Sequence, residues 1–155
     1  MIATGLFSFG CDSPDPSAKA WDSGKQQPVP AFSITFTLDD EARAQLSNAG
    51  ETIKGAIYFD GDGTPVPGVK TAPHRDVFLG KYEFELEEPG TILIEDATIS
   101  VEAYSRLSDR DYHYTINVFS GRRSFNNNVL DGGYAQGKHS NLGAEKSIDI
   151  ACTLL

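Results

Sequence analysis

Residues 53–94 read IKGAIYFDGDGTPVPGVKTAPHRDVFLGKYEFELEEPGTILI, and they contain the clearest succession of strands and turns in the chain. Every second residue from Ile53 to Phe59 falls on one face, which is the pattern of a half-buried strand. Residues 60–68 carry Asp-Gly dipeptides and two prolines, so we expect a turn or a sheet edge there. A second alternating run spans residues 82–86, and a third begins at Ile92 after a Pro-Gly turn.

The segment before this stretch predicts one more strand and a helix. Residues 32–38 alternate, with Phe32, Ile34, Phe36 and Leu38 on one face. Residues 39–46 have an acidic start and good helix formers, and Gly50 follows them, so they predict a short helix capped by Asp39 or Asp40. This helix would link two strands and cover an open end of the fold.

The segment after this stretch returns to alternation. Ile99, Val101 and Ala103 continue the alternation beyond Ile94, so they predict one strand that ends near Tyr104, and a charged loop follows. Residues 112–119 predict another strand, with Tyr112, Tyr114, Ile116 and Val118 on one face. Residues 120–139 predict a long polar loop, with a brief helical turn or strand near Val129 and Leu130. Residues 147–155 predict a last strand, inside the sheet, that buries Cys152.

The composition agrees with one all-β domain. The chain has 155 residues, 15 of them Gly and eight Pro, and short alternating runs lie between its turn clusters. We therefore predict a single antiparallel β-sandwich of about seven or eight strands with one short helix. Residues 32–155 would form the sandwich, and residues 1–31 an apolar N-terminal segment followed by a Pro/Ser-rich linker.

The motifs DGTPVPGV (62–69), GKYEFEL (80–86) and PGTILI (89–94) resemble the carboxypeptidase-regulatory-like and Cna B-type modules. These modules are small β-sandwiches of transthyretin-like topology that mostly serve as structural or binding units, so the resemblance implies no active site. The chain departs from the family pattern by inserting Thr71–Val77 between the hairpin arms. It also lacks a convincing Lys and Asn pair for an isopeptide crosslink.

The N-terminus resembles the end of a bacterial lipoprotein signal. A mildly apolar stretch leads to Gly10 and Cys11, and a polar tether rich in Pro and Ser follows, although no basic region precedes the stretch. Cys11 is thus a candidate for lipidation, which would place the protein in the periplasm or cell envelope. The alternatives are a free Cys11 or a disulfide with Cys152, and Cys152 could equally behave as a small buried hydrophobe. No segment of the sequence reaches the roughly 20 apolar residues that span a bilayer.

The net charge and one polar cluster of the sequence indicate which classes of partner the protein could bind. A net charge of −9 argues against nucleic acid as a partner, because binding a polyphosphate requires clustered Lys and Arg. It is compatible with a basic protein partner or with plain solubility. The compact donor-rich cluster of the sequence comprises Arg122, Arg123, Asn126, Asn127 and Asn128. It could form a recognition loop, or it could be a polar loop whose Asn side chains satisfy its own backbone.

Catalytic and metal motifs are weak. Asp60, Asp62 and Thr64 have the oxygen spacing with which calcium loops begin, but the position of the bidentate Glu is occupied by Thr71, so a plain Asp-Gly turn is the alternative. The three histidines, His74, His113 and His139, lie in separate segments and form no short zinc-ligand pair. Neither Cys nor Ser has a nucleophile signature. The sequence therefore predicts no enzyme, no cofactor and no metal.

Two function hypotheses follow. The first is a non-enzymatic envelope protein, secreted or anchored through Cys11, that binds another protein through residues 120–139 and neighbouring loops. An acidic inhibitor or immunity protein that neutralises a basic toxin or hydrolase is one form of it. The second is a structural module of a larger envelope complex. A third hypothesis, hydrolysis of a small ligand, would need a pocket in which residues such as His74, Asp76 and His113 converge.

Overall fold

The structure, a computed structural model, describes residues 24–68 and 75–155 of the chain. These residues form ten strands, two α-helices and one short 3₁₀ helix. In chain order the elements are β1 (Gln26–Pro28), β2 (Phe32–Leu38), α1 (Asp40–Ala49), β3 (Ile53–Gly61), β4 (Val77–Leu86), β5 (Thr91–Ile94), β6 (Thr98–Ser100), α2 (Val101–Ser105), β7 (His113–Ser120), β8 (Leu130–Asp131), β9 (Tyr134–Lys138), η1 (His139–Asn141) and β10 (Ser147–Leu154).

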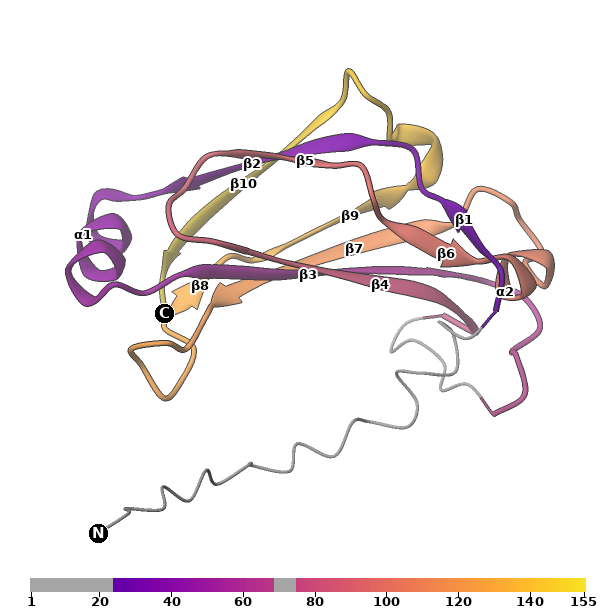
Figure 1. Cartoon of the computed structure of the whole chain (residues 1–155), viewed down its shortest axis with the longest axis horizontal. Helices are drawn as coiled ribbons and strands as arrows, with labels where there is room; N and C mark the ends of the chain where they lie inside the picture. Colours follow the sequence, from indigo (N-terminus) through magenta and orange to yellow (C-terminus); the bar gives the residue numbers. More distant parts are fainter. Residues whose placement is uncertain (1–23, 69–74) are drawn as a thin grey trace, which may run out of the picture.

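Two four-stranded sheets lie face to face, as an all-β sandwich predicts (Figure 1). One sheet has the strand order β5-β2-β10-β8 and the other β4-β3-β7-β9. A small sheet of β1 and β6 lies with α2 at one end of the sandwich, and α1 lies at the other end. The strands number more than the predicted seven or eight because β1, β6 and β8 are only two or three residues long, too short for a visible alternation.

The core lies between the two sheets and is built by the alternating residues of the sequence. Phe36 of β2 packs against Phe84 of β4 with ring centroids 5.3 Å apart, and Phe32 packs against Tyr114 of β7 at 6.3 Å. These contacts join one sheet to the other. β3, the strand at the centre of the opening stretch, pairs with both β4 and β7, and Ile57 in its middle is fully buried.

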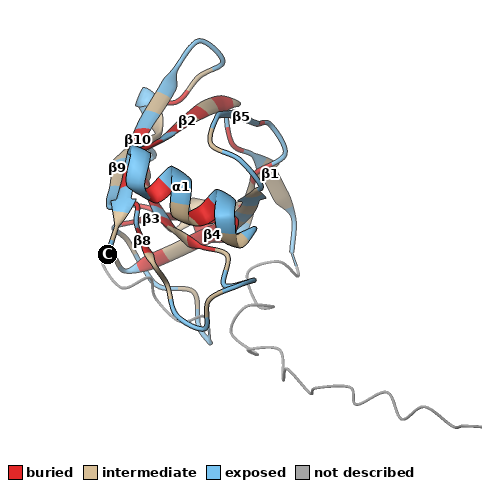
Figure 2. Cartoon of the chain, turned by 90° about the vertical axis from the view of Figure 1, so that its left-hand side faces the viewer, coloured by how far each residue is buried: buried red, intermediate tan, exposed pale blue. Residues whose placement is uncertain are grey.

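Helix α1 forms as the sequence predicts. The Asp39 carboxylate accepts a hydrogen bond of 2.7 Å from the Ala42 amide, which identifies Asp39 as the N-cap. Gly50 ends the helix in the left-handed region, with φ of 64°. Ala42 and Leu46 are buried on the inner face of the helix, which lies across the end of the sandwich (Figure 2).

One strand pair departs from an all-antiparallel arrangement. Among the described strands, β10 pairs in parallel with β2, from Ser147 opposite Ser33 to Cys152 opposite Leu38, whereas the other ladders are antiparallel. Strand β10 lies inside its sheet, as predicted, between β2 and β8. A parallel neighbour becomes available because the two strands belong to opposite ends of the chain and need no hairpin between them.

The predicted strand from Ile92 to Tyr104 is wrong in two respects. It is divided into the separate strands β5 and β6, and beyond Ser100 the chain forms α2 instead. The Ser100 hydroxyl accepts a hydrogen bond of 3.2 Å from the Ala103 amide and caps the helix. Residues four positions apart share a face in a strand and also in a helix. Ile99 and Ala103 are both buried, so their spacing fits either structure.

The predicted loop 120–139 is also wrong over part of its length. The brief strand near Leu130 is present as β8, which pairs with β10. Strand β9 follows and pairs with β7 in the opposite sheet, so the chain changes sheets at Gly132 and Gly133. β9 reads Tyr-Ala-Gln-Gly-Lys and has no apolar alternation, because its residues are exposed or only half-buried at the sheet edge.

The folded part reaches upstream of residue 32. Residues 26–28 form β1, which pairs with β6, and Val29 belongs to the buried core. The Val29 amide donates to the Ala97 carbonyl at 2.9 Å, which ties this segment to the body of the sandwich.

Candidate functional site: a slot beside helix α1

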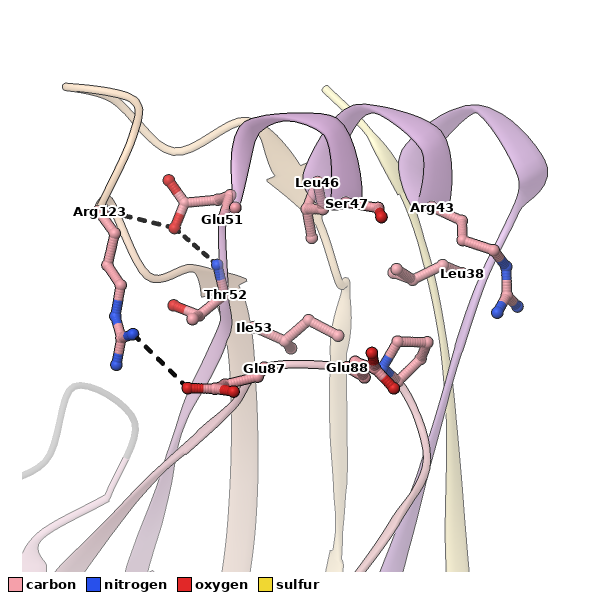
Figure 3. A pocket seen from close by; sticks show the side chains of 12 residues that line it. Leu38, Arg43, Leu46, Ser47, Glu51, Thr52, Ile53, Glu87, Glu88 and Arg123 are labelled. Atoms are coloured by element: carbon pink, nitrogen blue, oxygen red, sulfur yellow. Dashed lines mark hydrogen bonds and ion pairs between the residues drawn. The ribbon is translucent and has the colours of Figure 1, made fainter.

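A cavity of about 570 Å³ lies between α1 and the turn that joins β4 to β5 (Figure 3). We call it the α1 slot. Its apolar wall comes from Leu38, Leu46 and Ile53, and its charged rim comes from Arg43, Arg123, Glu87 and Glu88. Ser47, Gly50, Glu51, Thr52 and Pro89 complete the lining.

The apolar wall is produced by the convergence of three elements. Leu38 ends β2, Leu46 projects from the inner face of α1, and Ile53 begins β3. All three belong to the hydrophobic core, and their side chains face the slot in Figure 3. They are only 8%, 3% and 1% exposed, so the slot lies directly over the core at one end of the sandwich and leaves little of it uncovered.

The rim holds two cations and two anions. The Arg123 Nε lies 2.9 Å from the Glu85 Oε1, and the Arg123 Nη1 lies 3.9 Å from the Glu87 Oε1. The side chains of Arg123 and Glu87 are 54% and 86% exposed, so both stay accessible to a ligand. Arg43 and Glu88 are exposed and form no ion pair with any residue that the structure describes.

One buried carboxylate positions the loop that carries Arg123. Glu51 is only 3% exposed and accepts hydrogen bonds from the amides of Thr52, Arg123, Ser124 and Phe125 at 2.8, 3.1, 3.0 and 3.2 Å. Burial raises the pKa of Glu51, but these four bonds outweigh it, so the pKa lies below its usual range. Glu51 therefore remains ionised at neutral pH and cannot donate a proton.

The predicted binding residues have separate positions. Arg123 lines the slot, whereas Arg122 is exposed outside the lining, with φ of 60°. Asn126 and Asn127 are exposed and do not line the slot. Asn128 supports its own backbone, since its Oδ1 accepts from the Ser120 amide at 2.8 Å and from the Leu130 amide at 3.1 Å.

Three of the four charged rim residues were not predicted as site residues from the sequence. Arg43 lies three residues before Leu46 and thus near it on the helix surface, which is a signal that the helical pattern contained. Glu87 and Glu88 precede a Pro-Gly turn and resemble ordinary solvated charges. Their contribution to a cavity depends on where the turn packs, which alternation does not specify.

The calcium interpretation of the Asp-Gly turn is not supported by the contacts of its carboxylates. The Arg75 Nε lies 3.3 Å from the Asp60 Oδ1, and its Nη1 lies 3.1 Å from the Asp62 Oδ2. The Arg75 guanidinium thus forms an ion pair with each of the two carboxylates. Within residues 24–68 and 75–155, no group of three or more His, Cys, Asp or Glu is arranged to hold a metal.

The histidines are only partly placed, because His74 lies outside the described residues. His139 stacks on Tyr112 at 4.6 Å, and its Nδ1 lies 3.5 Å from the Asp111 Oδ1. His113 lines a separate polar cavity of about 380 Å³ with Asp60 and Lys138. Asp76, which belongs with His113 to the hydrolysis hypothesis, does not line that cavity.

Cys152 is a free, buried thiol that forms no disulfide with any described residue. Burial, and secondarily the charge of Asp131, raises its pKa to about 11, so the thiolate is a minor species at neutral pH. Cys152 thus behaves as a small hydrophobe. Cys11 lies outside the described residues.

Neither α1 nor α2 combines the length and the apolar character of a membrane-crossing helix, within the part of the chain that the structure describes. Comparisons with protein-family models, with curated proteins and with solved structures found no match for this chain. The resemblance of residues 53–94 to transthyretin-like modules therefore stays a prediction.

Proposed function

We propose that this protein is a non-enzymatic binding module that holds a segment of a partner protein in the α1 slot. The observation that carries the proposal is a cavity of about 570 Å³ that lies over core residues and is rimmed by two cations and two anions. An apolar side chain of a partner would gain free energy by leaving water for Leu38, Leu46 and Ile53. The surrounding charges would fix the orientation of the segment that carries it.

The acid–base properties of the slot support binding over catalysis. Its one buried acid, Glu51, is held ionised by four backbone amides. General acid or base catalysis requires a group whose pKa lies near the working pH, and the pKa of Glu51 is moved away from it.

The proposal also includes a location in the cell envelope and a basic partner. Cys11 would anchor the protein in the cell envelope, and the net charge of −9 would favour a basic partner. An inhibitor or immunity protein that neutralises a basic toxin or hydrolase would fit both properties. The transthyretin-like resemblance also supports a binding role rather than catalysis.

Two adjacent helix positions provide a matched test. Ser47 lines the slot and Asn48 does not, and both are exposed. A Ser47→Trp substitution would fill the slot, whereas Asn48→Trp would place the same indole outside it. The full chain and both variants are immobilised, exposed to native envelope extract and eluted with a salt gradient.

We expect one basic protein to be captured by the wild type and by Asn48→Trp, and to be lost with Ser47→Trp. Equal capture of that protein by all three chains would overturn the role of the slot. Recovery of only large envelope assemblies, again equal for all three chains, would favour the structural-module hypothesis instead.

A further inference from the structure

Among the strands that the structure describes, none pairs with the outer edge of β5. Strand β5 pairs with β2 on one side and is the terminal strand of its sheet. A terminal strand presents unpaired N–H and C=O groups that another extended chain can use.

The register identifies which backbone groups face outward. The Phe36 amide donates to the Gly90 carbonyl at 2.9 Å, so this pair is hydrogen-bonded across the ladder. Hydrogen-bonded pairs alternate with non-bonded pairs in an antiparallel ladder. Continuing the alternation along the register, Thr91 opposite Thr35 and Leu93 opposite Ser33 are non-bonded pairs. The peptide groups of Thr91 and Leu93 therefore point away from β2.

The charges around this edge define its partner. Glu87 and Glu88 precede β5, and Glu95 and Asp96 follow it, all of them exposed. Leu93, on the strand itself, is 53% exposed. A second copy of β5 would place acidic ends against acidic ends in either direction, which disfavours self-pairing. A strand with an apolar centre and basic ends would instead be complementary to it.

The edge is also continuous with the α1 slot. Glu87, Glu88 and Pro89 line the slot, and Gly90 then leads directly into β5. A strand added along β5 would therefore reach the slot at the end of β5 where Thr91 lies. One extended segment could use both features.

We propose that β5 receives, as an added strand, an extended partner segment with an apolar centre and basic residues at both ends. Backbone hydrogen bonds to Thr91 and Leu93 would hold the segment, and the acidic pairs at each end would set its position. This inference rests on the proposed function, since it names the chemistry of the partner segment that runs along β5 next to the slot.

The first test uses two synthetic peptides with the full chain. Both have the alternating centre Val-Thr-Val-Thr-Val; one carries two lysines at each end and the other two glutamates. Amide hydrogen exchange is followed by NMR. We expect the lysine peptide to slow exchange at Thr91 and Leu93 by about tenfold or more, with no change from the glutamate peptide.

If the acidic residues only protect the edge from aggregation, the lysine peptide leaves both amides unchanged, which overturns the inference. Binding of the lysine peptide with protection elsewhere, but not at Thr91 and Leu93, overturns it as well. Equal protection by both peptides would reject the charge selection that defines the partner.

A pair of variants separates the backbone from the side chain. Leu93→Pro removes an outward N–H without breaking a bond to β2, and Leu93→Ala keeps that N–H but removes the exposed side chain. We expect Leu93→Pro to weaken the binding of the lysine peptide by about tenfold, and Leu93→Ala to weaken it by clearly less. Equal losses would show that the side chain, not the strand edge, is recognised. Thermal melting verifies that both variants fold.

The two proposals fail separately. If Ser47→Trp abolishes partner capture while the lysine peptide protects neither the Thr91 nor the Leu93 amide, the proposed function of the slot is supported and the addition of a strand to β5 is rejected. If the amides are protected but Ser47→Trp has no effect on capture, the edge binds without the slot.

Discussion

The Glu51 carboxylate accepts a 3.1 Å hydrogen bond from the backbone amide of Arg123, 72 residues later in the chain. The same side chain also accepts from the amides of Ser124 and Phe125. Residues directly after α1 and the loop after β7 are thus tied together through one buried charge. These hydrogen bonds fix the position of Arg123 at the slot. From that position its side chain forms ion pairs with Glu85 and Glu87.

We expect Glu51→Gln to loosen this loop. An amide has one acceptor oxygen and no charge, so it cannot replace a carboxylate that receives four bonds. The free energy of unfolding should fall by about 1–3 kcal/mol, measured by urea denaturation. Amide exchange at Arg123, Ser124 and Phe125 should also become faster. Glu145→Gln, at an exposed position, is the control and should change neither quantity.

Gly132 provides a second test, at the point where the chain changes sheets. A Cβ added there would lie 2.5 Å from the Val118 Cβ and 2.9 Å from the Val118 carbonyl oxygen. We expect Gly132→Ala to lower the free energy of unfolding by about 1–3 kcal/mol, because backbone must move to accommodate the methyl group. Gly143→Ala, where the nearest contact is an ordinary 3.7 Å, should have a much smaller effect. Similar losses at both glycines would contradict close packing at Gly132.

His113 should make the fold sensitive to acid. Burial lowers its pKa, and the charges of Arg75 and Lys138 lower it further. Because the folded pKa is depressed, the unfolded chain takes up the proton first as the pH falls. The stabilising contribution of neutral His113 is present above the unfolded pKa of about 6.5 and is lost as the pH falls through the folded pKa.

We therefore expect His113→Gln to reduce the loss of stability between pH 7.5 and pH 5.5, measured as the shift of the urea midpoint. The comparison of slopes removes any pH-independent cost of the substitution. If the wild type and His113→Gln lose the same amount of stability between pH 7.5 and pH 5.5, the pKa of His113 is not depressed in the folded chain.

The cap of α1 distinguishes two adjacent acids. Asp39 caps the helix through Ala42, whereas Asp40 is its first residue. We expect Asp39→Ala to lower the free energy of unfolding by about 1 kcal/mol and Asp40→Ala by less, as measured by thermal melting. Asp39→Ala should also weaken partner capture, because α1 forms one wall of the slot. An equal cost at both positions would show that the first-turn charge matters more than the cap.

Much of the fold could be predicted because alternation reports burial directly. The strands at Phe32, Ile57 and Ile116 each pack one face on the core, so period two is visible in their sequences. Strand β9 lies exposed at an edge and β8 has two residues, so neither leaves such a pattern. Parallel pairing of β10 with β2 depends on chain topology, and no local residue records it.

The candidate site was predicted only in part, for a related reason. Arg123 belongs to the donor-rich cluster that the sequence predicts as a binding site, and it does line the slot. Asn128 belonged to the same cluster, but its hydrogen bonds go to the Ser120 and Leu130 backbone. The buried Glu51 looked like one of many surface carboxylates, because its burial depends on a loop more than 70 residues away. Sequence patterns report periodic burial, whereas a site built by distant loops requires the assembled fold.

The most direct test of the central claim is photo-crosslinking in intact cells of the host organism, with a photoreactive residue in place of Ser47. Ser47 lines the slot, whereas Glu145 precedes the opposite end of β10 and is the control position. We expect Ser47 to give one discrete adduct with a basic protein, and Glu145 to give none with it. Adducts of the same mass and yield from both positions, or none from Ser47 while another surface position gives one, would contradict the assignment of the α1 slot as the binding site.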